Sequence, residues 1–193
     1  YSLVTGPAFI IFTIGNFIGS QKAAAVIAIA HYVGALINGF FYRNHEEKKE
    51  KRKGGGRPPK GDYLENFTDA IVSGFKAMAM ILAYLMVFTI GINILEHLGV
   101  FSVINNQGVA ASFKGIFEMT IGINLVGMCD MGIRLKSVIA AFLVSFGGLS
   151  VAGQSMSMAR GSGIGLADIL KIKLTHGMIA AIITTILIHI VVI

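Results

Sequence analysis

The chain has 193 residues, of which 54% are hydrophobic and only 13% are charged, and its formal net charge is +6. Its mean hydropathy is +0.74, and it contains 24 glycines. This composition excludes a water-soluble globular protein, which needs far more polar surface, and indicates a protein that folds in lipid. The single cysteine, Cys129, excludes an intrachain disulfide and a Cys-rich metal site.

In chain order, the apolar segments predict an all-α, polytopic membrane protein. A helix needs about 20 mostly apolar residues to cross a bilayer. Four segments meet this requirement: 23–41, 76–95, 109–128 and 174–193. Open sheets cannot span a bilayer because their edges leave backbone groups unpaired, and these segments lack the alternating pattern of a β-barrel.

Two more apolar segments, 2–18 and 137–158, are interrupted by glycines. We expect each to form a re-entrant hairpin that enters and leaves on one side of the membrane. Residue 1 is not a methionine and apolar sequence follows at once, so we expect the chain to be a fragment.

Segment 43–62 is strongly basic, with eight Lys and Arg against three Glu and one Asp, and it includes three consecutive glycines and Pro58-Pro59. It predicts a flexible linker on the cytoplasmic side of the membrane, where basic loops are enriched, and contact with anionic lipid rather than nucleic acid. It would divide the chain into a first repeat, 1–42, and a second repeat, 63–193.

Starting from a cytoplasmic linker, segment 109–128 should cross back to the cytoplasm and deliver Arg134 and Lys136 there. Lys171 and Lys173 are expected on the same side. The hairpins at 2–18 and 137–158 would then enter from opposite sides, as in the inverted repeats of secondary transporters. Close packing of glycine-rich helices is the alternative explanation of the glycine pattern.

Glu118 and Thr120 lie within the apolar segment 109–128. An ionisable side chain in lipid costs a few kcal/mol unless it has a partner. Lys114, four residues earlier, would share a helix face with Glu118, so a structural ion pair is one interpretation. The other is that Glu118 and Thr120 face a polar cavity and bind a substrate, a proton or a coupling cation.

The segment 145–155 combines adjacent glycines with hydroxyl and amide side chains inside an apolar run. Glycine lets the backbone approach a ligand closely, and hydroxyl and amide groups supply donors and acceptors. We predict a substrate-binding tip here, with a packing kink as the alternative. Its candidate residues are Ser145, Gly147, Gly148, Ser150 and Gln154.

Two histidines lie in the apolar segments: His31 and His176. Each is interpreted as a packing residue, with proton carrier as the alternative. No catalytic triad, phosphate-binding loop or catalytic pair of carboxylates is present, so an enzyme is not predicted. Nor do we predict a metal site or a cofactor.

Five runs also resemble a known family in order and spacing: 6–10, 27–32, 69–71 with 88–90, 115–122, and the specific run SFGGLSV at 145–151, followed by Gln154. They resemble the YlbJ family of sporulation integral membrane proteins, whose members are longer. The chain therefore looks like their middle and C-terminal portion. The charged Gly/Pro linker departs from the short middle loop usual in that family.

The resemblance implies a gate or nucleoside-recognition domain, which is distantly similar to concentrative nucleoside transporters and to the gate of ferrous-iron transporters. It further implies a permease in the membrane of an endospore-forming bacterium, with dipicolinic acid as the associated anion. The alternatives are a nucleoside or purine permease and a non-transporting sporulation scaffold. A homo-oligomer is a further alternative, because a second copy of the chain could complete the two unmatched halves, 1–42 and 63–193.

Overall fold

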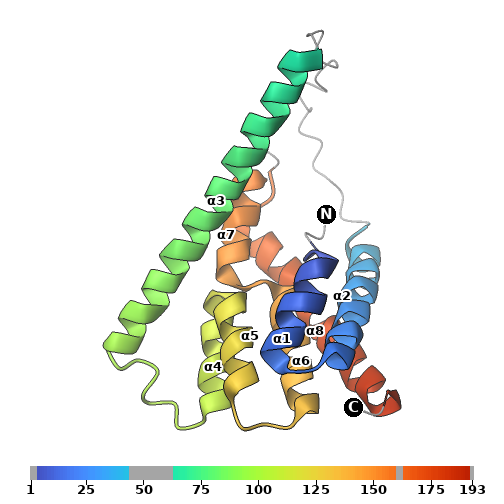
Figure 1. The fold of residues 1–193 in the computed structure, drawn as a ribbon, viewed down its shortest axis with the longest axis vertical. Coiled ribbons are helices and arrows are strands. Elements are labelled where there is room, and N and C mark those ends of the chain that lie inside the picture. The colour runs from blue at the N-terminus through green and yellow to red at the C-terminus, as the bar shows by residue number, and fades with distance from the viewer. Residues whose placement is uncertain (1–3, 44–62, 160–162, 192–193) are drawn as a thin grey trace.

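The structure, a computed structural model, describes residues 4–43, 63–159 and 163–191. Every regular element in these ranges is a helix, which confirms the all-α class (Figure 1). In chain order the elements are the π-helix η1 (Phe9–Ile14), α1 (Gly15–Ile18), α2 (Gln21–Tyr42), α3 (Tyr63–His97), α4 (Gln107–Phe117), α5 (Met119–Met128), α6 (Ile133–Phe146), α7 (Gly148–Met158) and α8 (Leu166–Ile190).

Four helical stretches are long and apolar enough to cross a membrane: α2, α3, α8, and α6 with α7 as one stretch of 26 residues. The spans predicted at 23–41 and 76–95 lie within α2 and α3. The last span begins eight residues before the predicted start at residue 174, because α8 extends back to Leu166. These lengths and compositions make the chain a polytopic integral membrane protein.

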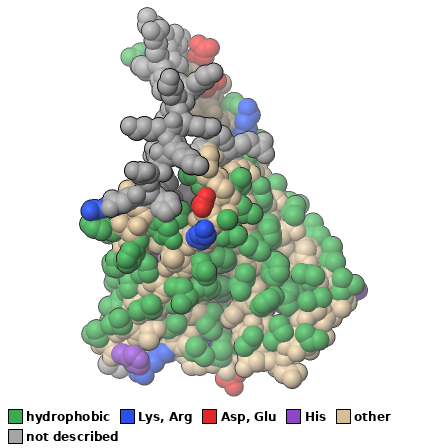
Figure 2. Space-filling view, turned by 180° about the vertical axis from the view of Figure 1, so that it is seen from behind, with side chains coloured by type: hydrophobic (Ala, Val, Ile, Leu, Met, Phe, Trp, Pro, Cys, Tyr) green, Lys and Arg blue, Asp and Glu red, His purple; other side chains and the backbone are tan. Residues whose placement is uncertain are grey.

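The distribution of side chains agrees with this class. On the face shown in Figure 2, hydrophobic side chains cover most of the described surface, and the charged side chains lie mainly toward its two ends. A bilayer would surround the apolar zone and leave the charged ends near water.

Helices α2, α6 and α8 pack against one another and form the centre of the fold. The short run η1–α1 packs along α2 and α5, and its Ile10 and Ile14 join a buried cluster with Ile27, Ile123 and Leu143. Helix α3 lies outside this group and leans away from it, with contacts to α7 and α4 (Figure 1).

The prediction that segment 109–128 crosses the membrane as one helix is wrong. Helix α4 ends at Phe117, Glu118 adopts an extended conformation, and α5 returns beside α4 as the second arm of a helical hairpin (Figure 1). The two arms pack backbone to backbone, since a Cβ added to Gly122 would collide with Cα of Gly115. The hairpin therefore returns the chain to the end from which α4 began.

This hairpin also corrects the predicted positions of Arg134 and Lys136. The turn between α5 and α6 lies at the same end as the loop between α3 and α4 (Figure 1). Arg134 and Lys136, in the first turn of α6, are thus at the end opposite the start of α3, and not beside the basic linker as predicted.

The prediction of a hairpin at 137–158 is wrong as well. Helices α6 and α7 follow one another as a broken span, interrupted at Gly147 and Gly148 (Figure 1). Both glycines have positive φ, 81° and 74°, which L side chains rarely adopt. The glycines therefore break the helix, as the sequence indicates, without reversing its direction.

The described residues show no inverted repeat. The run η1–α1 with α2, and α5 with α6, are two helix–turn–helix units that run in the same direction (Figure 1). Their short helices touch near their last residues, where Gly127 packs on the Phe17 carbonyl. The predicted linker at 43–62 lies outside the described residues except for Arg43, whose guanidinium is 4.3 Å from the centre of the Phe40 ring.

Candidate functional site

Two interruptions of helical structure, the hairpin tip at Glu118 and the α6–α7 break, meet the non-helical segment before η1 near the centre of the fold. The Thr5 hydroxyl donates a hydrogen bond to the Val144 carbonyl, at 3.5 Å. A Cβ added to Gly148 would lie 3.1 Å from the Phe117 carbonyl oxygen, next to the tip. We call this region the helix-break junction and define it by Thr5, Glu118, Ser145, Gly147 and Gly148.

The α6–α7 break leaves a helix start inside the junction. The Gly147 N–H donates to the Leu143 carbonyl at 2.8 Å and closes α6. No side chain caps the start of α7. Because the first N–H groups of any helix have no partner within it, the first turn of α7 presents donors and a positive dipole end to this site.

His31 of α2 connects two parts of the junction. Its Nε2 accepts a hydrogen bond from the Thr5 backbone N–H at 3.0 Å, and its Nδ1 lies 2.8 Å from the Ser145 hydroxyl oxygen. Since Nε2 accepts, a neutral ring must carry its proton on Nδ1 and donate it to Ser145. The nearby Tyr32 hydroxyl donates to the Thr5 carbonyl at 2.8 Å and further fixes this segment.

His176 of α8 holds the opposite side of His31. Its Nε2–H donates to the His31 carbonyl at 2.9 Å, and the two ring centres are 4.9 Å apart. Both side chains are buried. The histidines thus have hydrogen-bonded structural positions, in agreement with their interpretation as packing residues.

Lys173 of α8 is the buried charge that the sequence did not assign to the site. It is only 7% exposed. Its Nζ would lie 3.4 Å from a Cβ added to Gly147, so the ammonium group is beside the α6–α7 break. The sequence analysis placed Lys173 on the cytoplasmic side of the membrane, but helical spacing could have found it, since Lys173, His176 and Ala180 share the buried face of α8.

Glu118 occupies the hairpin tip and is only 2% exposed. Its Oε2 accepts a hydrogen bond from the Ile121 N–H at 2.8 Å, which caps α5. The alternative ion pair with Lys114 is wrong, because Lys114 pairs with Glu96 of α3 at 2.7 Å. The chain turns between residues 114 and 118, so the two charges do not share a helix face.

The other predicted residues divide between the junction and its surroundings. Ser150 is buried in the first turn of α7, and Thr120 is half-buried in the first turn of α5. Gln154 is half-buried six residues after Gly148, which at 1.5 Å per residue places it about 9 Å along α7. The structure therefore brings Ser145, Gly147, Gly148, Ser150 and Glu118 together and leaves Gln154 outside.

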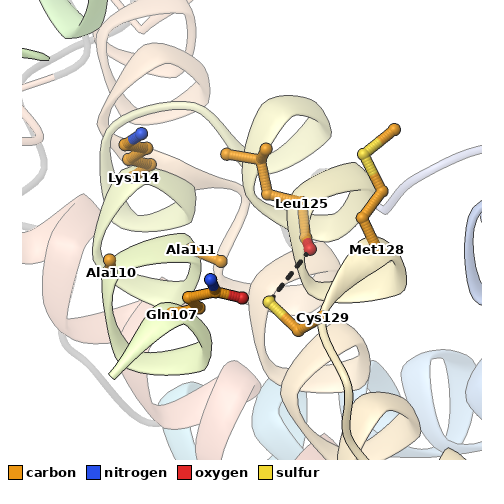
Figure 3. Close-up of a pocket in the computed structure, with 7 residues that line it drawn as sticks. All are labelled: Gln107, Ala110, Ala111, Lys114, Leu125, Met128 and Cys129. Carbon is orange, nitrogen blue, oxygen red and sulfur yellow. Dashed lines mark hydrogen bonds between the residues drawn. The ribbon is translucent and has the colours of Figure 1, made fainter. Parts of the chain in front are cut away.

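A separate open pocket of about 240 Å³ lies between the arms of the α4–α5 hairpin (Figure 3). Figure 3 shows the hydrogen bond from the Cys129 thiol to the Leu125 carbonyl, at 3.3 Å, on one side of it. None of its lining residues belongs to the junction; they are Gln107, Ala110, Ala111, Lys114, Leu125, Met128 and Cys129. In the part of the chain that the structure describes, no three His, Cys, Asp or Glu side chains gather as a metal site.

The fold and the junction define a polytopic α-helical membrane protein with a polar site buried where its helices break. Over 127 residues the chain is 24% identical to the sporulation integral membrane protein YlbJ of Bacillus subtilis (strain 168). The match covers 59% of this chain and 31% of the length of YlbJ. No family model and no solved structure matches the chain. The resemblance indicated by the sequence motifs is thus confirmed as a distant similarity to part of YlbJ.

Proposed function

We propose that the chain forms the central part of a membrane permease for a small polar solute, which binds at the helix-break junction. The convergence of two helix interruptions and the non-helical segment before η1 on buried polar side chains carries this proposal. Within a membrane, non-helical backbone is tolerated only where protein buries it or where it lines a watery cavity. Transporters use such interruptions to offer free N–H and C=O groups to a solute.

The proposed substrate is a small anion such as dipicolinic acid, moved during endospore formation. The similarity to a protein named for sporulation supports this setting. The membrane would be the cytoplasmic membrane or one around the spore, with linker 43–62 on the cytoplasmic side near anionic lipid. A second copy of the chain, or further helices, would complete the exposed side of α3.

All the predicted binding residues except Gln154 have a role in this scheme. Ser150 and the N–H groups of α7 would donate to the solute, while Ser145 is held by His31. Glu118 and Thr120, at the start of α5, would line the other side. Because the α4–α5 arms have only 11 and 10 residues, we propose that they form a re-entrant hairpin that ends inside the membrane.

The test is uptake of labelled dipicolinate, beside a labelled nucleoside, into vesicles that contain the full-length protein. We expect Glu118→Gln and Ser150→Ala to lower dipicolinate uptake at least tenfold. Glu65→Gln and Ser73→Ala, which change exposed residues of α3, are the matched controls and should retain uptake. Equal uptake by all four variants would overturn the proposed site.

The same assay separates the alternatives. Uptake of nucleoside in place of dipicolinate would make the protein a nucleoside or purine permease. If neither solute moves although the protein is folded and inserted, the permease proposal fails and the scaffold hypothesis takes its place.

A further inference from the structure

We infer that Lys173 and the first turn of α7 form a binding site for an oxyanion, the carboxylate or phosphate group of a small solute. The inference assigns Lys173 as the specificity-determining residue of the junction. It rests on the proposed function in one respect: the junction must open to solute for the group to enter.

The first observation is a buried charge without compensation. Lys173 is more than nine-tenths buried, and it makes no hydrogen bond or ion pair with any residue in the described ranges. A buried ammonium group is costly unless an opposite charge or acceptors surround it. Lys114, the other buried lysine among the described residues, shows the usual solution, since Glu96 pairs with it.

The second observation is the position of the ammonium group. It lies beside Gly147, the residue that precedes the first turn of α7. Helix α7 has 11 residues and no side-chain cap, so its uncapped N–H groups and dipole also favour a negative group at this point. Lys173 does not cap α6 instead, since its Nζ makes no hydrogen bond to a described carbonyl.

The third observation concerns the neighbouring side chains. Ser150 is 1% exposed and makes no hydrogen bond to a described residue, so its hydroxyl is free to donate to an anion. Among the described residues Glu118 forms no ion pair with Lys173, and its Oε2 accepts a hydrogen bond from the Ile121 N–H at the start of α5. His31 and His176 are engaged with Ser145 and with backbone, and they fix the walls of the site.

The test is binding of labelled dipicolinate to the full-length protein in lipid nanodiscs. Inorganic phosphate and the neutral pyridine-2,6-dicarboxamide serve as competitors. We expect Lys173→Met to weaken dipicolinate binding at least tenfold and Lys173→Arg to retain most of it. Lys171→Met, an exposed lysine of the same helix, should bind as the wild type does. The dicarboxamide should not compete.

Thermal unfolding of the same samples separates loss of the site from loss of the fold. Without bound anion, Lys173→Met should unfold at a temperature at least as high as the wild type, because it removes an uncompensated charge. Unchanged dipicolinate binding in folded Lys173→Met, or equal competition by the dicarboxamide, would overturn the inference. Lys173-dependent binding of phosphate but not of dipicolinate would support the site and identify phosphate as its ligand.

The inference and the permease proposal fail in different ways. Binding that depends on Lys173, with no solute flux in vesicles, would leave the anion site standing and remove the permease. Flux of a nucleoside without anion binding at Lys173 would leave the permease standing and remove the anion site.

Discussion

Gly148 lies where the α6–α7 break meets the α4–α5 hairpin. Its φ of 74° is one that L side chains rarely adopt. A Cβ there would also lie 3.1 to 3.2 Å from two carbonyl oxygens and an amide nitrogen of the hairpin. These are backbone atoms, so the hairpin as a whole would have to shift.

We therefore predict that Gly148→Ala lowers the free energy of unfolding by about 1 to 3 kcal/mol. The measurement is thermal unfolding of the purified protein in detergent. Gly132→Ala is the matched control, since Gly132 has a φ of −60° and a Cβ there meets no atom within 4 Å. That control should stay within about 0.5 kcal/mol of the wild type. Equal stability of the two variants would contradict the role given to Gly148.

At this scale the sequence singled out four of the five residues that define the junction, all except Thr5. Glu118, Ser145, Gly147, Gly148 and Ser150 were recognisable because polar or flexible residues stand out in an apolar run. The contacts of these residues were not predictable, because Thr5, His31 and Lys173 reach the junction only through the packing of distant helices. The His31–Ser145 hydrogen bond joins residues 114 positions apart, and no local pattern predicts such a contact.

At the scale of elements, the α4–α5 hairpin decides the topology of the chain. Arms of 11 and 10 residues extend about 16 Å each, roughly half the 30 Å of a bilayer core. If the hairpin is re-entrant, the loops before and after it lie on one side of the membrane. If 107–128 crossed as a single helix, these loops would lie on opposite sides.

We predict that Asn105→Cys and Asp130→Cys, in a Cys129→Ala background, react with an impermeant thiol reagent from the same side of sealed vesicles. Both positions are exposed. Tyr63→Cys, at the start of the spanning helix α3, should react from the other side and serves as the reference. Labelling of Asn105→Cys and Asp130→Cys from opposite sides would show that the hairpin opens into a single crossing.

Hydropathy could not separate these two arrangements. Segment 109–128 has the length and composition of a spanning helix, and segment 137–158 has the glycines of a hairpin tip. In the structure, segment 109–128 forms the hairpin and segment 137–158 forms the broken span. Gly115 and Gly122 let the backbones of α4 and α5 touch, whereas Gly147 and Gly148 interrupt a helix that continues in the same direction. The spans in α2, α3 and α8 were predictable because a long apolar run without a central polar break is compatible only with a spanning helix.

At the scale of the whole molecule, two parts of the chain offer different functions. The packed group of α2, α6 and α8 surrounds the junction and suits a permease. The basic segment 43–62, which lies outside the described residues except for Arg43, suits recruitment of anionic lipid or protein partners and so a scaffold. One set of substitutions distinguishes them, because the two parts are separate in sequence.

We predict that replacing the eight Lys and Arg of segment 43–60 by Gln leaves dipicolinate uptake per correctly oriented protein within about twofold of the wild type. The charges would act on orientation and lipid contact, and orientation should become more mixed. Uptake in vesicles is measured beside protease accessibility of the linker, which reports the orientation of each preparation. Loss of uptake at unchanged orientation, together with normal uptake by Ser150→Ala, would move the function from the junction to the linker.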